Sequence, residues 1–190
     1  MVSRSLTVAF LSLVLLVGAR AELNLSPKLA DFVGEGMTFH HLVFSDGSGS
    51  EITYRPPDGW QYSGSATKLT LHPPNKAEAE GTITSVSLSH LGAFDEETMG
   101  QLVKQALAEV PEDSTDLTLV SQEKNPIKIG SKETFLVVIS YMFYGERFER
   151  SSMFMNRDSE QIHFQFVSRA ADFNDLQRAF LGSQCTWNNL

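Results

Sequence analysis

Cysteine is almost absent from this sequence, since its 190 residues include one, Cys185. A single cysteine cannot form a disulfide within the chain, so we expect the fold to be held by its hydrophobic core. No Cys-x-x-Cys motif surrounds Cys185, and we interpret it as a semi-buried apolar residue near the C-terminus. A free reactive thiol and a link between two chains are the alternatives.

Positive charge is also scarce. The chain has 15 lysines and arginines against 23 acidic residues, which gives a formal net charge of -8. Nucleic-acid binding depends on cations that meet phosphates, so this balance argues against a nucleic-acid partner. The same balance argues against electrostatic binding to anionic lipid.

Long apolar runs are missing except near the N-terminus. There, an apolar run over residues 6–18 follows Arg4 and precedes Ala19-Arg20-Ala21. This order is typical of a secretory signal peptide, and the run is too short for a membrane helix, which needs about 20 apolar residues. We therefore predict a signal peptide over residues 1–21 with cleavage after Ala21. The mature protein would be secreted or periplasmic, with no integral membrane segment and a formal net charge of -10.

Diagnostic catalytic and ligand-binding motifs are absent as well. The sequence contains no Gly-x-Ser-x-Gly elbow, no His-Glu-x-x-His pair and no Gly-rich phosphate loop between a strand and a helix. The segment Asp46-Gly-Ser-Gly-Ser lacks the regularly spaced acidic ligands of a calcium loop, so we interpret it as a flexible loop. We predict no cofactor and no catalytic or metal-binding residue.

Five histidines are present, namely His40, His41, His72, His90 and His163. Adjacent histidines such as His40 and His41 are candidates for metal binding. Neighbours in a strand point to opposite faces, however, so both would rarely reach one ion. Ser89-His90 places a hydroxyl beside an imidazole in sequence alone, whereas a nucleophile and its base must meet in space.

A charged stretch of the sequence also has a catalytic and a structural interpretation. Glu146 and Glu149 alternate with Arg147 and Arg150 on a predicted strand. Paired carboxylates can act in acid–base catalysis, but a solvated face with cross-strand ion pairs explains the same residues more simply.

The segment 22–36 carries Leu25, Leu29, Phe32 and Val33 at helical spacing, and glycines end the pattern. We predict that this N-terminal segment forms a short helix or a docked arm. Its Asn24-Leu25-Ser26 triplet fits the N-glycosylation acceptor pattern, which is short enough to occur often by chance.

The rest of the chain alternates between strand and helix patterns. Helices are predicted over 95–110 and 172–181, with Asp95 and Asp172 as N-caps. The predicted strands are 38–44, 68–72, 82–90, 117–122, 135–144, 148–155 and 161–168, and residues 51–54 are predicted as a short extended piece. Together they indicate an α+β fold with one antiparallel sheet of about six or seven strands flanked by helices.

The strand over 135–144 is apolar at consecutive positions, which exceeds what one buried face requires. Either helices cover both faces of the sheet, or some rings line an apolar pocket. The aromatic residues concerned are Phe135, Tyr141, Phe143, Tyr144, Phe148 and Phe154.

Two segments carry a characteristic order of packing residues. Residues 52–60 are Ile-Thr-Tyr-Arg-Pro-Pro-Asp-Gly-Trp, an extended piece that leads to a Pro-rich turn. The predicted strand that includes residues 161–166 is followed by Phe173, Leu176, Phe180 and Trp187. These segments resemble the early strand and turn, and the last strand and helix, of the PsbP-like fold family, an α-β-α sandwich that includes secreted bacterial members of unknown role. The resemblance implies one domain over residues 37–187. It implies binding or assembly rather than catalysis, and it carries over no functional residue.

These observations favour a non-enzymatic secreted or periplasmic domain that binds a protein or an envelope component. A carrier that holds a small apolar ligand between sheet and helix is the alternative. A hydrolase that uses a histidine with a serine or carboxylate is a weaker one.

Overall fold

The computed structural model describes residues 23–34, 36–46, 49–88, 92–157 and 159–189. The predicted signal peptide and the pair Ser89-His90 lie outside the described residues. Within the described residues the chain forms two antiparallel sheets and two helices.

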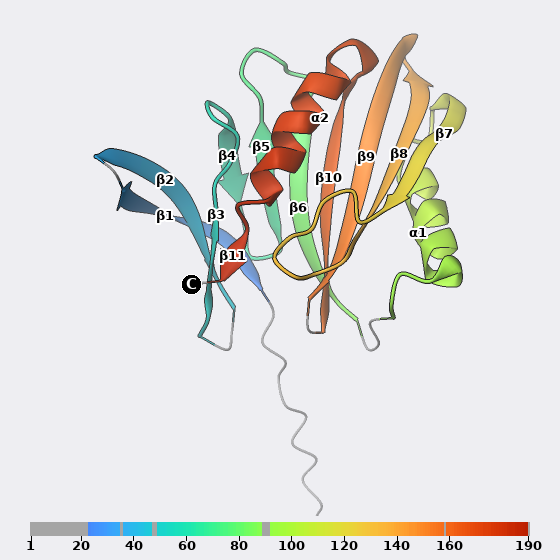
Figure 1. Cartoon of the computed structure of the whole chain (residues 1–190). Coiled ribbons are helices and arrows are strands. Elements are labelled where there is room, and N and C mark those ends of the chain that lie inside the picture. The colour runs from blue at the N-terminus through green and yellow to red at the C-terminus, as the bar shows by residue number, and fades with distance from the viewer. Residues whose placement is uncertain (1–22, 35, 47–48, 89–91, 158, 190) are drawn as a thin grey trace, which may run out of the picture.

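Seven antiparallel strands form the main sheet in the order β4-β5-β6-β10-β9-β8-β7 (Figure 1). Tyr144 and Gly145 connect β8 to β9 with positive φ angles of 48° and 79°, the combination found in a tight hairpin turn. The strand count and the antiparallel order confirm the predicted α+β sheet. The strands are β4 (Gln61–Gly64), β5 (Lys68–His72), β6 (Glu80–Ser87), β7 (Thr115–Lys124), β8 (Thr134–Phe143), β9 (Glu146–Arg157) and β10 (Glu160–Arg169).

A second, smaller sheet was not predicted. It has the order β1-β2-β3-β11, with β1 (Asn24–Gly34), β2 (Met37–Ser45), β3 (Glu51–Tyr54) and β11 (Asn188–Asn189). The helix considered for residues 22–36 is therefore wrong. These residues form a strand because they pair with β2, for example Asp31 opposite His40 and Phe32 opposite Phe39. Tertiary pairing of this kind overrides local apolar spacing.

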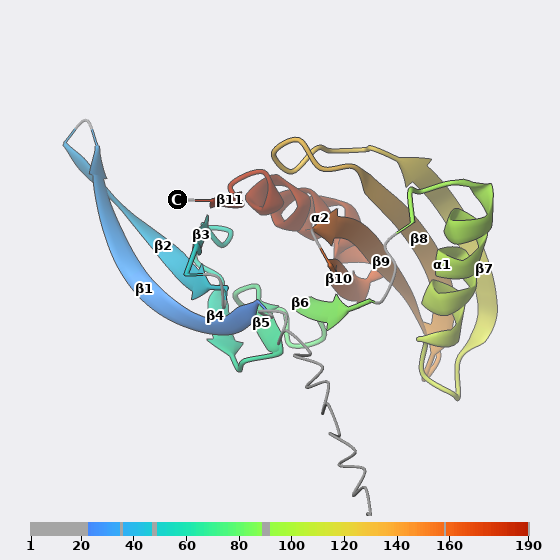
Figure 2. The same ribbon diagram turned by 90° about the horizontal axis from the view of Figure 1, so that it is seen from below.

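The small sheet is attached to the end of the second helix. Tyr54 of β3 and Ser183 share a hydrogen bond of 2.8 Å between their hydroxyl oxygens. Trp187 stacks on Phe44 of β2 with ring centroids 5.5 Å apart. The β1–β2 hairpin lies on the opposite side of the molecule from the first helix and β7 (Figure 2).

The first helix, α1 (Glu96–Ala108), begins as predicted. The Asp95 carboxylate accepts a hydrogen bond of 2.8 Å from the Thr98 amide, which satisfies one free N–H of the first turn. The second helix, α2 (Ala170–Gln184), follows β10 directly. Asp172 is not its N-cap, because the helix begins two residues earlier with Arg169 at the cap position and Asp172 inside the first turn.

The two helices cover opposite faces of the main sheet. Along β8, Phe135, Val137 and Ile139 belong to the apolar cluster of α1, whereas Leu136 and Val138 belong to the cluster of α2. Successive side chains of a strand point to opposite faces, so β8 is buried on both. This arrangement confirms the α-β-α sandwich and explains the consecutive apolar residues over 135–144.

Aromatic rings fill the layer between α2 and the sheet. The Phe166 ring lies 5.9 Å from that of Phe173 and 5.6 Å from that of Phe180, between centroids. Trp60 stacks on Phe180 at 6.3 Å between ring centroids and belongs to the same core cluster. A Cβ added to Gly81 would lie 2.8 Å from the Phe180 ring, so β6 passes α2 closely at that glycine.

Candidate functional site

Strand β7 forms one end of the main sheet, and it pairs with β8 on one side. All ten of its residues are exposed. Three of them are large and apolar, with exposed fractions of 43% for Leu117, 39% for Leu119 and 53% for Val120. Leu119 lies opposite Ile139, which packs beneath α1, so Leu119 shares the face of the sheet that carries the helix.

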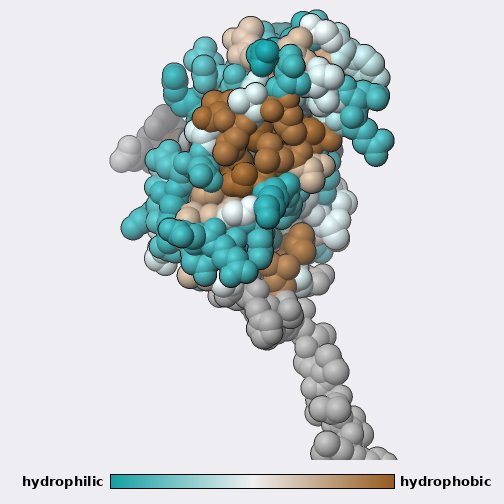
Figure 3. Space-filling model, turned by 90° about the vertical axis from the view of Figure 1, so that its right-hand side faces the viewer, coloured by the Kyte–Doolittle hydropathy of each residue, from teal (hydrophilic) through white to brown (hydrophobic). Residues whose placement is uncertain are grey.

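Helix α1 extends this apolar surface. Its Val103 and Leu107 are partly buried against the sheet and partly open to solvent. We define the β7–α1 face as Leu117, Leu119, Val120, Val103 and Leu107. Figure 3 views this side of the molecule and shows a hydrophobic area bordered by hydrophilic residues. An apolar patch with a polar rim is the usual form of a protein-docking surface.

The space beside this face is hollowed between α1 and β7. A cavity of about 400 Å³ is lined by Met99 and Gly100 of α1, Gln122 and Lys124 of β7, and Phe135 of β8, with Glu96 at its rim. Lys124 is already engaged, since its Nζ donates to the Phe94 carbonyl at 3.1 Å and pairs with Glu133 at 3.5 Å.

Acidic side chains dominate the border of the β7–α1 face. Glu112 and Asp113 are exposed in the connector before β7, and Asp116 and Glu123 are exposed on β7 itself. Lys104 is an exposed cation of α1. The rim therefore favours a partner surface that carries positive charge.

A second hollow lies between the β1–β2 hairpin and residues 55–60. This groove has a volume of about 300 Å³ and is lined by Leu29, Phe39, Trp60 and Tyr62, among others. The Arg55 guanidinium lies 5.4 Å from the centroid of the Phe39 ring and donates to the Asp58 carboxylate at 2.9 Å. Because its cation is already paired and stacked, the groove offers mainly apolar and aromatic contact.

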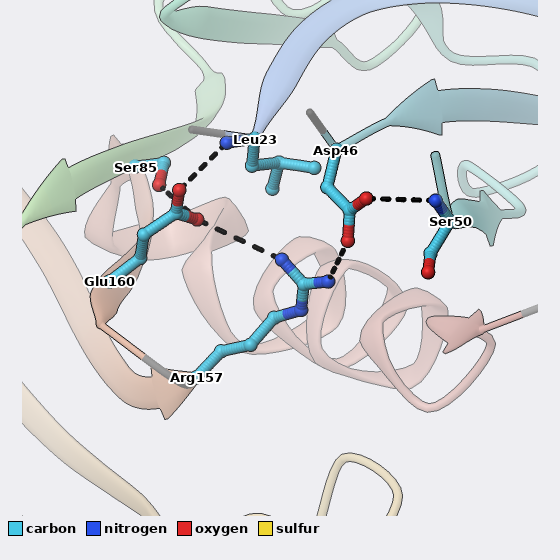
Figure 4. Close-up of polar contacts among 6 residues, drawn as sticks. All are labelled: Leu23, Asp46, Ser50, Ser85, Arg157 and Glu160. Atoms are coloured by element: carbon cyan, nitrogen blue, oxygen red, sulfur yellow. Dashed lines mark hydrogen bonds and ion pairs between the residues drawn. The ribbon is translucent and has the colours of Figure 1, made fainter. Parts of the chain in front are cut away.

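A buried ionic cluster joins the two sheets (Figure 4). We define it as Asp46, Arg157 and Glu160. The Arg157 guanidinium lies 2.6 Å from the Asp46 carboxylate and 3.8 Å from that of Glu160, and all three residues are buried. Glu160 also accepts hydrogen bonds from the Leu23 amide at 2.8 Å and from the Ser85 hydroxyl at 3.1 Å. The cluster thus connects the small sheet to β6, β9 and β10.

Asp46 begins the predicted loop over residues 46–50, of which Gly47 and Ser48 lie outside the described residues. The Asp46 carboxylate accepts from the Ser50 amide at 2.9 Å in addition to binding Arg157. Burial and these two partners fix Asp46 in place. Sequence reasoning missed the cluster because the two partners of its shortest ion pair lie 111 positions apart.

Each of the described histidines has a different partner. His40 pairs with Asp31 at 2.7 Å, whereas the ring of His41 lies 4.8 Å from that of Phe32, as expected for neighbours on opposite faces. His72 lies 3.9 Å from Glu80 at the sheet surface. Within the described ranges, no group of three or more His, Cys, Asp or Glu side chains could hold a metal ion.

His163 occupies the middle of the main sheet, where its ring stacks on Phe154 at 4.5 Å. Burial lowers the pKa of the imidazole below its usual value, nearby Arg150 lowers it further, and the Glu109 carboxylate opposes both effects. The neutral imidazole is therefore the form that the fold favours.

The charged stretch of β9 makes one cross-strand ion pair and two further hydrogen bonds. Glu146 binds Arg169 of β10 at 2.6 Å between Oε2 and Nε. Arg147 donates to the Ser140 hydroxyl of β8 at 3.2 Å, and Arg150 donates to the Glu109 carbonyl. Burial raises the pKa of the Glu149 carboxyl, and the nearby Arg147 opposes that shift.

Cys185 is exposed, so the predicted semi-buried position is wrong. It follows the last turn of α2, where the helix surface turns to solvent. Asn24 is exposed too, and its side-chain oxygen accepts from the Ser26 amide at 2.9 Å. Its glycosylation stays a prediction.

Helices long and apolar enough to cross a bilayer are absent from the described part of the chain.

No protein-family model and no curated protein matches the sequence. The fold and the site define an α+β sandwich with an open apolar edge. Solved structures place this sandwich in a recognised class: the chain has the PsbP-like fold, as its two local motifs indicated.

Three similar structures support this assignment. Cyanobacterial PsbP (CyanoP) from Synechocystis sp. PCC 6803 has a TM-score of 0.54 and 10% identity over 84% of this chain and 98% of its own. LpqN of Mycobacterium tuberculosis, involved in cell envelope biogenesis, has a TM-score of 0.53 and 11% identity over 88% of this chain and 91% of its own. A Pseudomonas aeruginosa protein of unknown function has a TM-score of 0.50 and 15% identity over 83% of this chain and 94% of its own.

Proposed function

We propose that this protein is a non-enzymatic, extracytoplasmic binding domain that docks a protein of the cell envelope or its surroundings through the β7–α1 face. The observation that carries the proposal is the exposure of Leu117, Leu119 and Val120 on an open edge strand beside a partly exposed helix. An exposed apolar patch with a charged rim is stabilised when a partner removes it from water.

Two further points support the proposed extracytoplasmic location. The predicted signal peptide would export the mature chain. LpqN, which shares the fold, is involved in cell envelope biogenesis in its own organism. An envelope component is accordingly the kind of partner we expect.

The chemistry of the β7–α1 face suits binding rather than catalysis. Its centre consists of Val and Leu side chains, which supply no nucleophile, acid or base. The buried carboxylates of the ionic cluster are already bound to Arg157 and lie where the two sheets meet. The hydrolase hypothesis stays a prediction, and so does the carrier, although aromatic rings occupy much of the layer between sheet and α2.

Site-specific photo-crosslinking in producing cells tests the proposal. A benzophenone amino acid replaces Val120, and a matched control carries it at Val86, a β6 residue with a nearly equal exposed fraction of 52%. We expect one reproducible protein adduct from position 120 in the extracytoplasmic fraction and none of that mass from position 86. Leu119→Glu in the same chain should remove the adduct.

Two results would contradict the proposal. Equal adducts from positions 120 and 86 would show that contact is non-specific. An adduct that survives Leu119→Glu would place the docking surface elsewhere on the molecule.

A further inference from the structure

The outer side of β7 offers main-chain hydrogen bonds as well as apolar side chains. In an antiparallel pair, alternate residues direct both N–H and C=O toward the partner strand, and the residues between direct theirs away. β7 ends the strand order of the main sheet, so its outward groups face no further strand among the described residues. Over Ser121–Lys124 its register with β8 is unbroken, from Ser121 opposite Val138 to Lys124 opposite Phe135.

We propose that β7 accepts an extended segment of the partner protein as an additional strand of the main sheet. The segment would carry apolar side chains at alternate positions and lysine or arginine near its ends. This inference rests on the proposed function and specifies the partner's chemistry at the same face.

The apolar requirement follows from the strand geometry. Side chains of an added strand alternate between the two faces of the sheet, and those on the α1 side would lie beside Leu119 and over the exposed flank of Val103 and Leu107. Main-chain pairing supplies affinity in such complexes, and the alternate side chains supply specificity.

Charge complementarity requires the basic ends. Asp116 and Glu123 lie near the two ends of β7, and Glu112 and Asp113 precede it. An added strand would bring its own ends against these carboxylates, which favours cations there. A second copy of this chain is disfavoured, because its net charge of -8 and its equally acidic edge would meet like charge.

Two irregularities of β7 restrict which strands can bind. The register with β8 shifts between Thr115 and Thr118 and again between Leu119 and Ser121. Bulges of this kind twist an edge and prevent indiscriminate edge-to-edge pairing. The incoming segment would therefore form its regular ladder against Ser121–Lys124.

Single proline substitutions test the main-chain pairing separately from the apolar face. Ser121 and Gln122 are neighbours, so one directs its N–H to β8 and the other directs it outward. Thermal melting of Ser121→Pro and Gln122→Pro identifies the outward position as the variant with the smaller loss, because proline is tolerated on an outer edge. Ser121→Ala and Gln122→Ala are the matched controls.

The probe is a synthetic peptide of about nine residues that alternates valine and threonine and carries lysine at both ends. A second peptide of the same sequence is N-methylated at alternate amides, and a third carries glutamate at its ends. Titration into the whole protein measures the dissociation constant. We expect the outward proline variant to weaken binding about ten-fold or more and the alanine controls to match the unchanged protein. The N-methylated and glutamate peptides should bind the unchanged protein at least as weakly as the first peptide binds the outward proline variant.

The outcomes separate the two proposals. If Leu119→Glu abolishes binding while the outward proline variant and the N-methylated peptide bind normally, the docking face is correct and strand addition is wrong. If Leu119→Glu, the outward proline variant and the N-methylated peptide all leave binding unchanged, the docking face and the strand addition are both wrong. Dimers in sedimentation experiments that the outward proline variant dissociates would identify a second copy as the occupant and overturn the inference.

Discussion

The two edge strands of the main sheet, β4 and β7, differ in length and in their neighbours. β4 is four residues long and lies beside β1, whose Leu25 amide donates to the Ala66 carbonyl at 2.9 Å just beyond β4. β7 is ten residues long and exposed along its whole length, with Leu117, Leu119 and Val120 among its residues. Proteins commonly shorten or cover an edge to prevent unwanted pairing. β4 is short and β1 approaches its Gly64 end, whereas β7 is long and has no strand beside its outer edge among the described residues, which is why we assign binding to β7.

The covered edge depends on the small sheet. β1 approaches β4 so closely that a Cβ on Gly64 would lie 2.6 Å from the Pro27 ring. The ionic cluster fixes the neighbouring strands, since Glu160 binds the Leu23 amide and Arg157 binds Asp46. Disruption of either contact should expose β4 and make it more like β7.

Arg157→Met should have the largest effect. It leaves the Asp46 and Glu160 carboxylates buried without their cation, and breaking a buried ion pair in this way typically costs about 3–5 kcal/mol. We expect a loss of that size in the free energy of unfolding, measured by urea denaturation. We also expect faster proteolysis within β1 and β2.

The matched control is Arg178→Met, because the Arg178 side chain is 80% exposed on α2. Its free energy of unfolding should stay within about 0.5 kcal/mol of the unchanged protein, as is usual for surface substitutions. A loss below about 1 kcal/mol in Arg157→Met would mean that the cluster does not hold the sheets together.

Gly64→Val should have a moderate effect by unseating β1 from β4. The new side chain would overlap the Pro27 ring and approach the Leu25 carbonyl, and forced overpacking costs about 1–3 kcal/mol. Thermal or urea unfolding measures the loss. Sedimentation should reveal new self-association through the uncovered β4 edge.

Gly100→Val is the control for Gly64→Val. Apart from the neighbouring residues and the backbone of its own helix, no described atom lies within 4 Å of a Cβ built on Gly100, and valine has a slightly better helix propensity than glycine. Stability should be unchanged or slightly higher. A Gly64→Val protein as stable and monomeric as this control would show that β4 does not depend on β1.

His163 tests the middle of the sheet without altering either edge. Because its folded pKa lies below its unfolded value near 6.5, the unfolded chain binds the proton more tightly. The stability from the neutral ring is complete above about pH 6.5 and is lost as pH falls through the window below it. We expect the free energy of unfolding to fall with acidification in this range, measured by urea denaturation at a series of pH values.

His163→Gln should flatten that pH dependence. His41, whose pKa is lowered mainly by burial and also by Arg55, supplies a residual slope, and His41→Gln is the matched control. Identical slopes in the unchanged protein and in His163→Gln would exclude His163 as the titrating group.

Local patterns in the sequence were sufficient for six of the seven strands of the main sheet and for both helices. The stripe that predicted α1 depends on neighbours within the helix, and Asp95 caps it through a contact three residues away. β1 was mistaken because Leu25, Leu29 and Phe32 also fit helical spacing, and its pairing with β2 decides the outcome. β4 was missed because its four residues, all exposed, carry no apolar alternation.

The candidate site was less predictable than the fold. A strand was predicted over 117–122, but its own residues could not predict that it is an edge strand. The edge position follows from the order of all seven strands. The signal that existed was Leu117, Leu119 and Val120 between acidic segments. Likewise, Asp46 and Arg157 become partners through the packing of two sheets, which no local spacing records.

Substitutions of Val120 and Val86 should have the smallest effect on stability, and they compare two equally exposed apolar residues directly. Val120 on β7 and Val86 on β6 have exposed fractions of 53% and 52%. Val120→Lys and Val86→Lys should each change the free energy of unfolding by no more than about 0.5 kcal/mol, because both side chains already lie largely in water. An apolar fluorescent dye should nevertheless bind less to Val120→Lys alone, since Val120 lies on the same strand as the exposed Leu117 and Leu119, whereas Val86 is the large exposed apolar residue of β6. Equal dye binding by the two variants would mean that β7 exposes isolated residues rather than a docking surface, and the contrast between the two edges would then be one of length alone.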